Sequence, residues 1–537
     1  MKPKNCFFTR GLGMFLLLSL CILSQVIPSY AAVQLFARNG SPFDYFGTSV
    51  SISGDTIIVG APFGDGEMPD SGWVGVFRDD GVTWREETKL SAQDGAPYDY
   101  FGYSTSISGN VVVVGALASN MFRGSAYVFR YDGAGWKEEV KLVAADGADY
   151  DCFGYSVSIS GNTIVVGAPF NNGGSGASGS VYVFTYDGSN WVQATKLMAA
   201  DGAESDAFGV SVSLSGNTMV VGAPNTDGRH LDSGSAYVFE FAGSHWTQAA
   251  KLTAKDAAES DYFGSSVSIS EDRIVVGAPS SDEKEPDAGS AYVFEHEGTG
   301  WNEKVKLIVS DSPPYVNFGT AVSTGGNTIV VGTPFLGLAY VYWPDGTLRT
   351  QLTSPDSTSS DGFGNAVAAS GNTVVVGAPF MDWGAPDFGT AYVFTYEESS
   401  SKVYVDIQPG SCPNPVNTRS KGVLPVAVLG TETFDVNRID PGTIRLSREG
   451  VDGEVAPTRS GYEDIATPFE GDLCGCHKLK SDRNTDLALK FDIQELVTAL
   501  RLKEVAGVTV TLTVTGNLKE EFGGTPFQGQ DCIQVSK

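Results

Sequence analysis

The stretch Asp261-Tyr-Phe-Gly-Ser-Ser-Val-Ser-Ile-Ser-Glu-Asp-Arg-Ile-Val-Val-Gly-Ala-Pro279, followed after a polar loop by Gly289-Ser-Ala-Tyr-Val-Phe294, is one of seven copies of a single pattern. Each copy contains a Phe-Gly pair, which begins at Phe46, Phe101, Phe153, Phe208, Phe263, Phe318 or Phe363. A Gly follows each of these Phe residues after fourteen positions, whereas successive copies begin 45 to 55 residues apart. A constant inner spacing with connections of variable length indicates a structural repeat.

Each copy contains four segments with strand character. The first, such as residues 156–160, alternates Ser with Val or Ile, and a Gly-Asn turn joins it to a β-branched run such as residues 164–166. The third is exemplified by residues 235–239, and the fourth begins at a Trp and ends in Lys-Leu, as in residues 246–252. Alternation, tight turns and apolar runs are typical of antiparallel strands. Four such strands in a repeat of about 50 residues predict the blade of a β-propeller.

The combination of Phe-Gly with Gly-Ala-Pro resembles the FG-GAP repeat of the integrin alpha-subunit head and of many exported bacterial proteins. The resemblance covers roughly residues 33–397, and seven copies match the seven blades of an integrin-like propeller. Two copies depart from Gly-Ala-Pro, because Leu117 stands in place of the Pro and Thr333 in place of the Ala. The resemblance implies a seven-bladed β-propeller.

The N-terminal segment is expected to complete the last blade. The seven copies are followed by only six fourth strands, because the last copy runs from Tyr396 directly into a polar, Ser-rich segment. Residues 33–38, just before the first Phe-Gly, align with the ends of other fourth strands such as residues 89–93. Pairing there would close the ring and remove a sheet edge. The predicted fold is therefore all-β: a seven-bladed β-propeller closed by its N-terminal strand, followed by a small β-sandwich-like domain.

The resemblance raises the question of whether these repeats bind calcium. In integrin-type repeats, calcium binds in a carboxylate-rich loop between the first and second strands. Here that loop is only Gly-Asn, Gly54-Asp55 or Glu271-Asp272. This offers too few oxygens for an ion that takes about six to eight ligands. The sequence therefore assigns no cofactor and no metal to these hairpins, and calcium stays open only on the opposite face of the ring.

The first 31 residues have the pattern of an export signal. Lys2, Lys4 and Arg10 precede an apolar run at residues 14–27, and small residues flank the expected cleavage after Ala31. No later segment is long enough to span a bilayer. The formal net charge of −28 argues against nucleic acid and anionic membranes as partners. We therefore expect a secreted or cell-surface protein, with the propeller at residues 32–397.

Residues 398–402 form a polar linker in this interpretation, and residues 403–537 a second domain. Strand patterns occur at residues 403–407, 422–429, 443–447, 486–491 and 508–514, and residues 493–503 have helical spacing. Residues 406–415 and 421–430 resemble a module at the C-termini of exported bacterial proteins, for which the resemblance implies no activity.

The tail contains four cysteines that are disulfide candidates in an oxidising compartment: Cys412, Cys474, Cys476 and Cys532. Cys474 and Cys476 are too close for an easy mutual bridge, so each is expected to pair with one of the other two. A metal site built on Cys474, Cys476 and His477 is the alternative. A weaker metal candidate alternates oxygen ligands at Asp482, Asn484 and Asp486, but no Gly or distal Glu completes a calcium loop, so these residues are expected in a surface turn.

The strand directions place the fourth-to-first and second-to-third connections on one face of the ring, which we call the loop face. It carries the long variable loops, several Tyr residues, and Asp-rich segments that approach five of the seven Phe-Gly pairs, such as the segment with Asp94 and Asp99, so it is expected to be acidic and aromatic. Because loops on a rigid scaffold commonly carry function, this is the candidate binding face. Its candidate contact residues are Asp99, Asp151, Asp206, Asp261, Asp361, Tyr100 and Tyr262. Each Asp also has a structural alternative, which is to cap a turn.

No catalytic motif is recognisable, and the chain has only four His. The main hypothesis is therefore an exported, non-catalytic adhesion or ligand-binding protein whose partner is an extracellular protein or glycan. A carbohydrate-active enzyme is an alternative, because paired carboxylates from separate blades leave no spacing signature. A structural cell-surface component without a discrete ligand is the other alternative.

Overall fold

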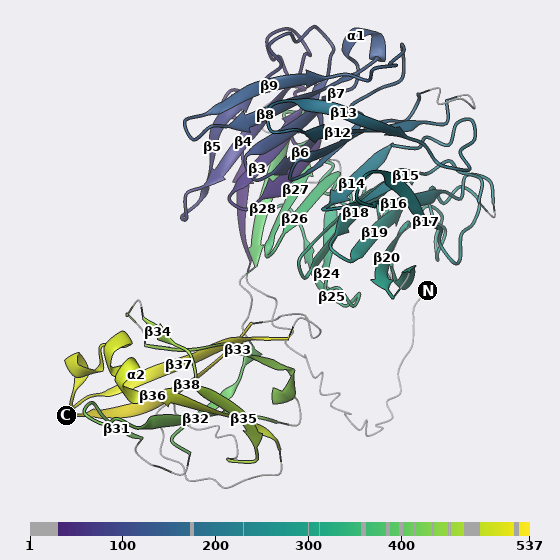
Figure 1. Cartoon of the computed structure of the whole chain (residues 1–537). Helices are drawn as coiled ribbons and strands as arrows, with labels where there is room; N and C mark the ends of the chain where they lie inside the picture. The colour runs from purple at the N-terminus through teal and green to yellow at the C-terminus, as the bar shows by residue number, and fades with distance from the viewer. Residues whose placement is uncertain are drawn as a thin grey trace, which may run out of the picture.

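The computed structural model describes residues 30–171, 177–228, 230–298, 300–310, 312–355, 361–382, 387–396, 401–409, 411, 414–431, 434–448, 450–451, 453–466, 484–519 and 526–537. In these residues the chain is dominated by β-strands, which form seven four-stranded antiparallel sheets and then two further sheets (Figure 1). The seven sheets are the blades of a propeller, so the all-β, seven-bladed prediction is confirmed.

Each of the first six blades is a meander of four consecutive strands. Their strands are β2 (Ser49–Ser53), β3 (Thr56–Ala61), β4 (Trp73–Asp79) and β5 (Trp84–Leu90); β6 (Phe101–Ser108), β7 (Val111–Ala116), β8 (Ser125–Tyr131) and β9 (Trp136–Leu142); β10 (Ser156–Ser160), β11 (Thr163–Ala168), β12 (Ser180–Tyr186) and β13 (Trp191–Leu197); β14 (Ser211–Ser215), β15 (Thr218–Ala223), β16 (Ser235–Phe241) and β17 (Trp246–Leu252); β18 (Ser266–Ser270), β19 (Arg273–Ala278), β20 (Ser290–Glu297) and β21 (Gly300–Leu307); and β22 (Ala321–Gly325), β23 (Thr328–Thr333), β24 (Leu338–Tyr342) and β25 (Leu348–Leu352).

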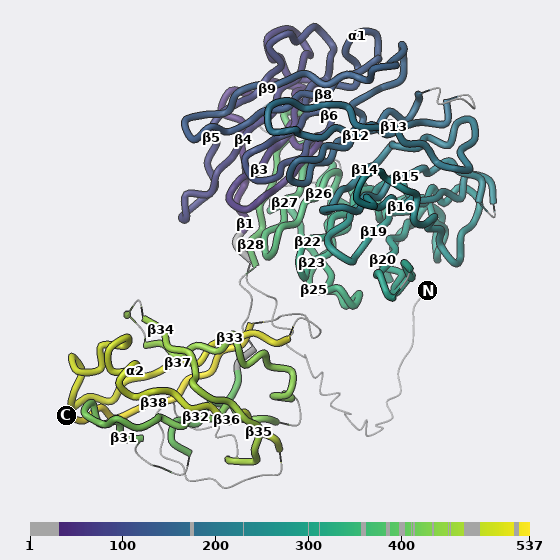
Figure 2. The backbone as a smooth tube through the Cα atoms, viewed as in Figure 1, coloured from purple at the N-terminus to yellow at the C-terminus, as the bar shows by residue number. Residues whose placement is uncertain are grey.

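The last blade combines the two ends of the repeat region. It contains β26 (Ala366–Ser370), β27 (Thr373–Ala378) and β28 (Thr390–Tyr396), and its fourth strand is β1 (Tyr30–Leu35). β1 runs antiparallel to β28, with Val33 opposite Val393, and Figure 2 shows the two strands side by side. The strand begins three residues before the predicted segment 33–38. The expected export signal falls almost wholly on residues 1–29, which lie outside the described part of the chain.

The Phe of each Phe-Gly pair is a packing centre between strands. Phe153 has no exposed surface, and its ring meets those of Tyr182 and Phe184 on β12 at centroid distances of 5.4 and 6.0 Å. Edge-to-face contacts of this kind add to the burial of the rings. The same arrangement recurs around Phe101, Phe208, Phe263 and Phe318.

The Gly of Gly-Ala-Pro lets adjacent blades approach each other closely. A Cβ at Gly167 would lie 2.0 Å from the carbonyl oxygen of Gly209, which is the Gly of the next Phe-Gly pair. That second Gly has φ near +97° and donates its N–H to the carbonyl of Gly222 at 3.0 Å. The close approach recurs from the last blade to the first, where Gly377 meets Gly47. The invariant spacing of the repeat therefore specifies the contact between blades.

The C-terminal part of the chain forms two sheets over its own apolar core. One sheet contains β29 (Ser401–Lys402), β38 (Pro526–Ser536), β37 (Thr509–Leu518), β33 (Ile439–Arg448) and β34 (Glu454–Val455), with β31 (Pro415–Asn417) also paired to β38; the other contains β30 (Tyr404–Ile407), β32 (Val423–Leu429), β36 (Asp486–Asp492) and β35 (Arg459–Glu463). Two short 3₁₀ helices, η1 (Val436–Arg438) and η2 (Leu502–Val505), and helix α2 (Ile493–Ala499) connect strands. All five predicted strands are present, and the predicted helix is divided between α2 and η2.

The tail candidates have different outcomes. Cys412, Cys474, Cys476, His477 and Asp482 lie outside the described residues, so the disulfide pairing and the Cys-His metal site stay predictions. Cys532 is buried on β38. Asp486 is fully buried, and its carboxylate accepts backbone N–H groups of Gly430, Ile465 and Ala466 at 2.7 to 3.0 Å. Its expected location in a surface turn was wrong, because these three bonds tie the carboxylate into the domain core.

Candidate functional site

The Asp residues proposed as ligand contacts are turn residues. Asp99, Asp151, Asp206, Asp261 and Asp361 are between 1 % and 6 % exposed. In the first four, the carboxylate accepts the backbone N–H three residues earlier, as Asp99 does from Ala96 at 2.9 Å. Burial raises the pKa of the Asp99 carboxyl, although the Ala96 N–H partly opposes it. These four carboxylates therefore face their own turn, as the capping alternative has it, and the ligand-contact role of the five Asp residues stays a prediction.

In four approach segments, a second Asp binds side chains of the blade that follows. Asp146 accepts hydrogen bonds from Lys196 at 2.6 Å and from the Tyr182 hydroxyl at 2.7 Å. Burial would raise the pKa of the Asp146 carboxyl, but these two bonds outweigh burial and lower it. Equivalent pairs join Lys141 to Asp94, Lys251 to Asp201 and Lys306 to Asp256. These carboxylates therefore stabilise the contact between each of these approach segments and the blade that follows it.

Aromatic rings form a continuous arc on the loop face, across the last blade and the first three. Ring centroids are 5.6 Å apart for Phe380 and Tyr45, 5.1 Å for Tyr45 and Phe63, and 4.7 Å for Phe63 and Tyr100. The arc continues from Tyr103 to Tyr155 at 5.2 Å and on to Phe170 at 6.2 Å. Tyr100, Tyr103 and Tyr155 pack against one small apolar cluster, which joins the two halves. We call these seven residues the aromatic arc.

The arc lies beside the propeller axis. Its residues precede or follow a Phe-Gly pair, or follow a Gly-Ala-Pro. The innermost strands β2, β10 and β26 start two residues after the Gly of such a pair, and the innermost strand β6 contains one. These innermost strands pack against each other around the axis. Phe170 is 47 % and Phe380 is 42 % exposed, and the other five rings are partly exposed. The arc therefore presents a contiguous apolar surface to solvent.

Comparison with known proteins identifies the repeats. The family model of the FG-GAP repeat matches seven segments: residues 31–77, 84–129, 136–184, 191–239, 246–294, 301–342 and 347–394. The chain belongs to the FG-GAP repeat family. No curated protein matches the sequence.

An FG-GAP repeat is offset from a blade by one strand. The segment 84–129 begins with β5, the outer strand of the first blade, and continues through β6, β7 and β8 of the second. The segment 31–77 likewise begins with most of β1, which is the outer strand of the last blade. Each FG-GAP repeat therefore links two adjacent blades.

The second FG-GAP copy, in which Leu117 replaces Pro, has an unusual loop at the centre of the arc. In α1 (Ser119–Phe122), Asn120, Met121 and Phe122 have φ values between 52° and 61°. A left-handed conformation costs a residue with a side chain about 1–2 kcal/mol. Met121 is 63 % exposed and Tyr150 is 64 % exposed, and the Phe122 and Tyr150 rings stack at 6.1 Å. Such strain commonly accompanies functional surfaces.

The three remaining blades are far less aromatic at the corresponding positions. These positions hold Ala207, Val210, Asn225, Tyr262, Ser265, Ser280, Asn317, Thr320 and Phe335. Tyr262 is thus separated from the end of the arc by the fourth copy, which has Ala207, Val210 and Asn225 at these positions, and Tyr262 is not part of the cluster that contains Tyr100. The sequence does contain a signal for the arc: aromatic residues at variable positions beside the invariant motifs.

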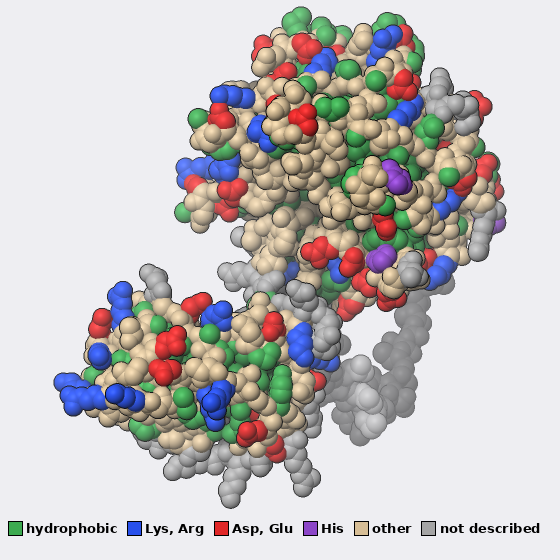
Figure 3. Space-filling view, viewed as in Figure 1, with side chains coloured by type: hydrophobic (Ala, Val, Ile, Leu, Met, Phe, Trp, Pro, Cys, Tyr) green, Lys and Arg blue, Asp and Glu red, His purple; other side chains and the backbone are tan. Residues whose placement is uncertain are grey.

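The described residues of the loop face contain no group of three side chains that could hold a metal ion. In the part of the chain that the structure describes, no three His, Cys, Asp or Glu side chains are grouped as a metal ion would require. At the hairpin where relatives bind calcium, Asp55 pairs with Arg78 at 3.2 Å, and the two-residue turn does not fit that ion. Figure 3 shows acidic side chains scattered among basic ones over the visible surface. None of the helices within the described ranges is long and apolar enough to cross a membrane.

Proposed function

We propose that this FG-GAP protein is an exported, non-catalytic adhesion or ligand-binding protein whose aromatic arc contacts an extracellular protein or glycan. The observation that carries the proposal is the arc itself. The proposal of export rests on the signal pattern in residues 1–31. The propeller holds the seven aromatic side chains of the arc in fixed positions.

Partly exposed aromatic rings are suited to two kinds of contact. Their faces stack on the apolar face of a sugar ring, and they also bury apolar or cationic side chains of a protein partner. A contiguous exposed apolar surface is uncommon on a soluble protein without a partner. The strained loop beside the arc exposes Met121 and Phe122, and this favours the same face as the contact surface.

The carboxylates of the loop face support binding more than catalysis. Asp99 and its equivalents are buried in turns, and Asp146 and its equivalents are paired with Lys. A carboxylate that acts as a general acid or nucleophile must reach the substrate. The partly exposed rings of the arc, by contrast, are available for contact with a ligand.

The proposal can be tested with glycan and extracellular-protein arrays in the presence of calcium, using the full chain. The test variant is Phe170→Ala with Phe380→Ala, because both rings are well exposed and their loss should leave the fold intact. The control is Phe241→Ala, which removes an exposed ring beside the hairpin on the opposite face.

We expect the double variant to lose at least about tenfold in affinity for the ligand that the parent binds, whereas the control keeps it. Equal binding by parent and double variant would refute the arc as the contact surface. Hydrolysis of a bound glycan, abolished by substitution of a loop-face carboxylate, would replace the binding protein with an enzyme.

A further inference from the structure

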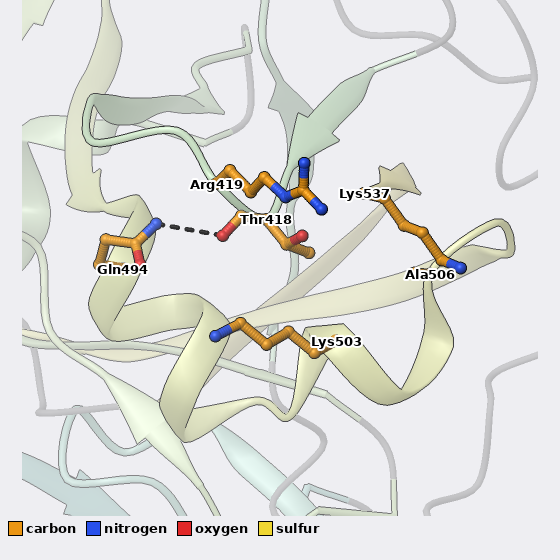
Figure 4. Close-up of a pocket in the computed structure, with 6 residues that line it drawn as sticks. All are labelled: Thr418, Arg419, Gln494, Lys503, Ala506 and Lys537. Atoms are coloured by element: carbon orange, nitrogen blue, oxygen red, sulfur yellow. Dashed lines mark hydrogen bonds between the residues drawn. The ribbon is translucent and has the colours of Figure 1, made fainter.

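The C-terminal domain contains a pocket of about 530 Å³ that plays no part in the loop-face site. It is lined by Thr418, Arg419, Gln494, Lys503, Ala506 and Lys537 (Figure 4). These residues come from the turn after β31, from α2 and η2, and from the residue after β38. Half of the lining side chains are cationic and none is acidic, in a chain with a net charge of −28.

The backbone that carries the cations is fixed by hydrogen bonds. The Gln494 side chain donates to the carbonyls of Thr418 and Ser420 at 3.2 and 2.5 Å, which anchors the turn around Arg419 to α2. The N–H of Thr418 donates to Ser536 at 3.0 Å, and the N–H of Gly507 donates to Val535 at 2.8 Å. The walls therefore keep their spacing without a ligand, which lowers the entropic cost of binding one.

The three cationic side chains are not paired with an acidic side chain in the described part of the chain. Within the described residues, neither Arg419, Lys503 nor Lys537 takes part in an ion pair, whereas the propeller lysines such as Lys196 are paired with Asp. Figure 3 shows Lys and Arg side chains gathered at the end of the domain where the chain ends. Like charges around one hollow repel each other, and a bound anion would relieve that repulsion.

We propose that this pocket binds a doubly charged oxyanion group, a phosphate or a sulfate, carried by a small molecule or a glycan residue. The planar Arg419 guanidinium can donate to two oxygens at once, and Lys503 and Lys537, whose side chains extend in opposite directions in Figure 4, add positive charge from other walls of the hollow. A singly charged carboxylate would leave most of the positive charge uncompensated. The volume accommodates the group together with one attached ring.

Isothermal titration of the full chain at low ionic strength tests this site with inorganic phosphate, phenyl phosphate, phenyl sulfate and benzoate as probes. The variants are Arg419→Gln and Lys503→Gln. The matched control is Lys519→Gln, which removes a cation beyond the opposite end of β37 in the same domain. Thermal melting of each variant checks that the domain is folded.

We expect saturable binding of phosphate or sulfate probes, at least about tenfold weaker in each pocket variant and unchanged in the control. The stronger of the two phenyl esters identifies the preferred group. Absence of saturable binding, a preference for benzoate, or equal affinity in folded Arg419→Gln and parent would overturn the proposal.

Discussion

Replacement of Gly167 by Ala tests how adjacent blades are held. The added methyl would lie 2.0 Å from the carbonyl oxygen of Gly209 and 2.4 Å from the Ser156 hydroxyl oxygen. The hydroxyl can rotate away, but the Gly209 carbonyl cannot, because its backbone is fixed by the bond from Gly209 N–H to Gly222. Relief of the contact therefore requires the third and fourth blades to separate locally by more than about 1 Å.

The expected cost follows from packing alone. Gly167 does not have a positive φ, so Ala can adopt the same backbone conformation. Because Ala has less conformational freedom than Gly in the unfolded chain, the replacement by itself would stabilise the folded state by about 0.4–1 kcal/mol. Overpacking a core usually costs about 1–3 kcal/mol, and a backbone atom as the clashing partner puts this case at about 3 kcal/mol or more. At about 2 °C per kcal/mol for a large domain, the melting temperature should fall by about 6 °C.

Differential scanning calorimetry of the parent, Gly167→Ala and Gly161→Ala measures this effect. Gly161 lies in the hairpin of the same blade at φ +55°, where an added methyl meets no atom within 4 Å. Its replacement should cost only about 1 kcal/mol, from the left-handed backbone. If Gly167→Ala melts within about 1 °C of the parent, or above Gly161→Ala, then close approach of the blades does not explain the invariant Gly.

Three further outcomes are expected. Deletion of residues 33–38 should lower the melting temperature of the propeller by about 10 °C, because β28 would lose its partner strand; an unchanged melt would contradict closure by β1. Lys196→Met should lower the free energy of unfolding by about 0.5–1 kcal/mol at pH 7. Because Asp146 has a lowered pKa in the folded state, its ion pair stabilises the fold at pH values above the ordinary Asp pKa of 3.8, and the difference between variant and parent in urea unfolding should shrink as the pH falls below that value. An equal difference at pH 3 and pH 7 would argue against the ion pair. Burial of Cys152 raises the pKa of its thiol to about 11, so alkylation at pH 8, followed by mass spectrometry, should modify it only after unfolding, and rapid labelling of the folded protein would contradict that burial.

The loop-face carboxylates show where reasoning from the sequence leaves two alternatives open. Asp99 and Asp94 look alike along the chain, and both were expected on an acidic face. In the fold Asp99 turns inward to the Ala96 N–H, while Asp94 binds Lys141 and Tyr127. Which way a carboxylate turns depends on the donors that the next blade supplies, and those lie about 30 to 50 residues further along the chain. The strand β38 was missed for a related reason: its alternating polar residues gain their burial only from the other sheet strands.

The sequence by itself determined the number of blades, their strand order and the contacts between them, because every interface repeats one local requirement: a buried Phe and two Gly residues that pass at close range. Only the tertiary structure decided the candidate site. Phe380 and Tyr45 come from the last and first copies, and their rings meet because the ring of blades closes. Closure is a property of all seven blades together, so no single copy of the repeat encodes the aromatic arc.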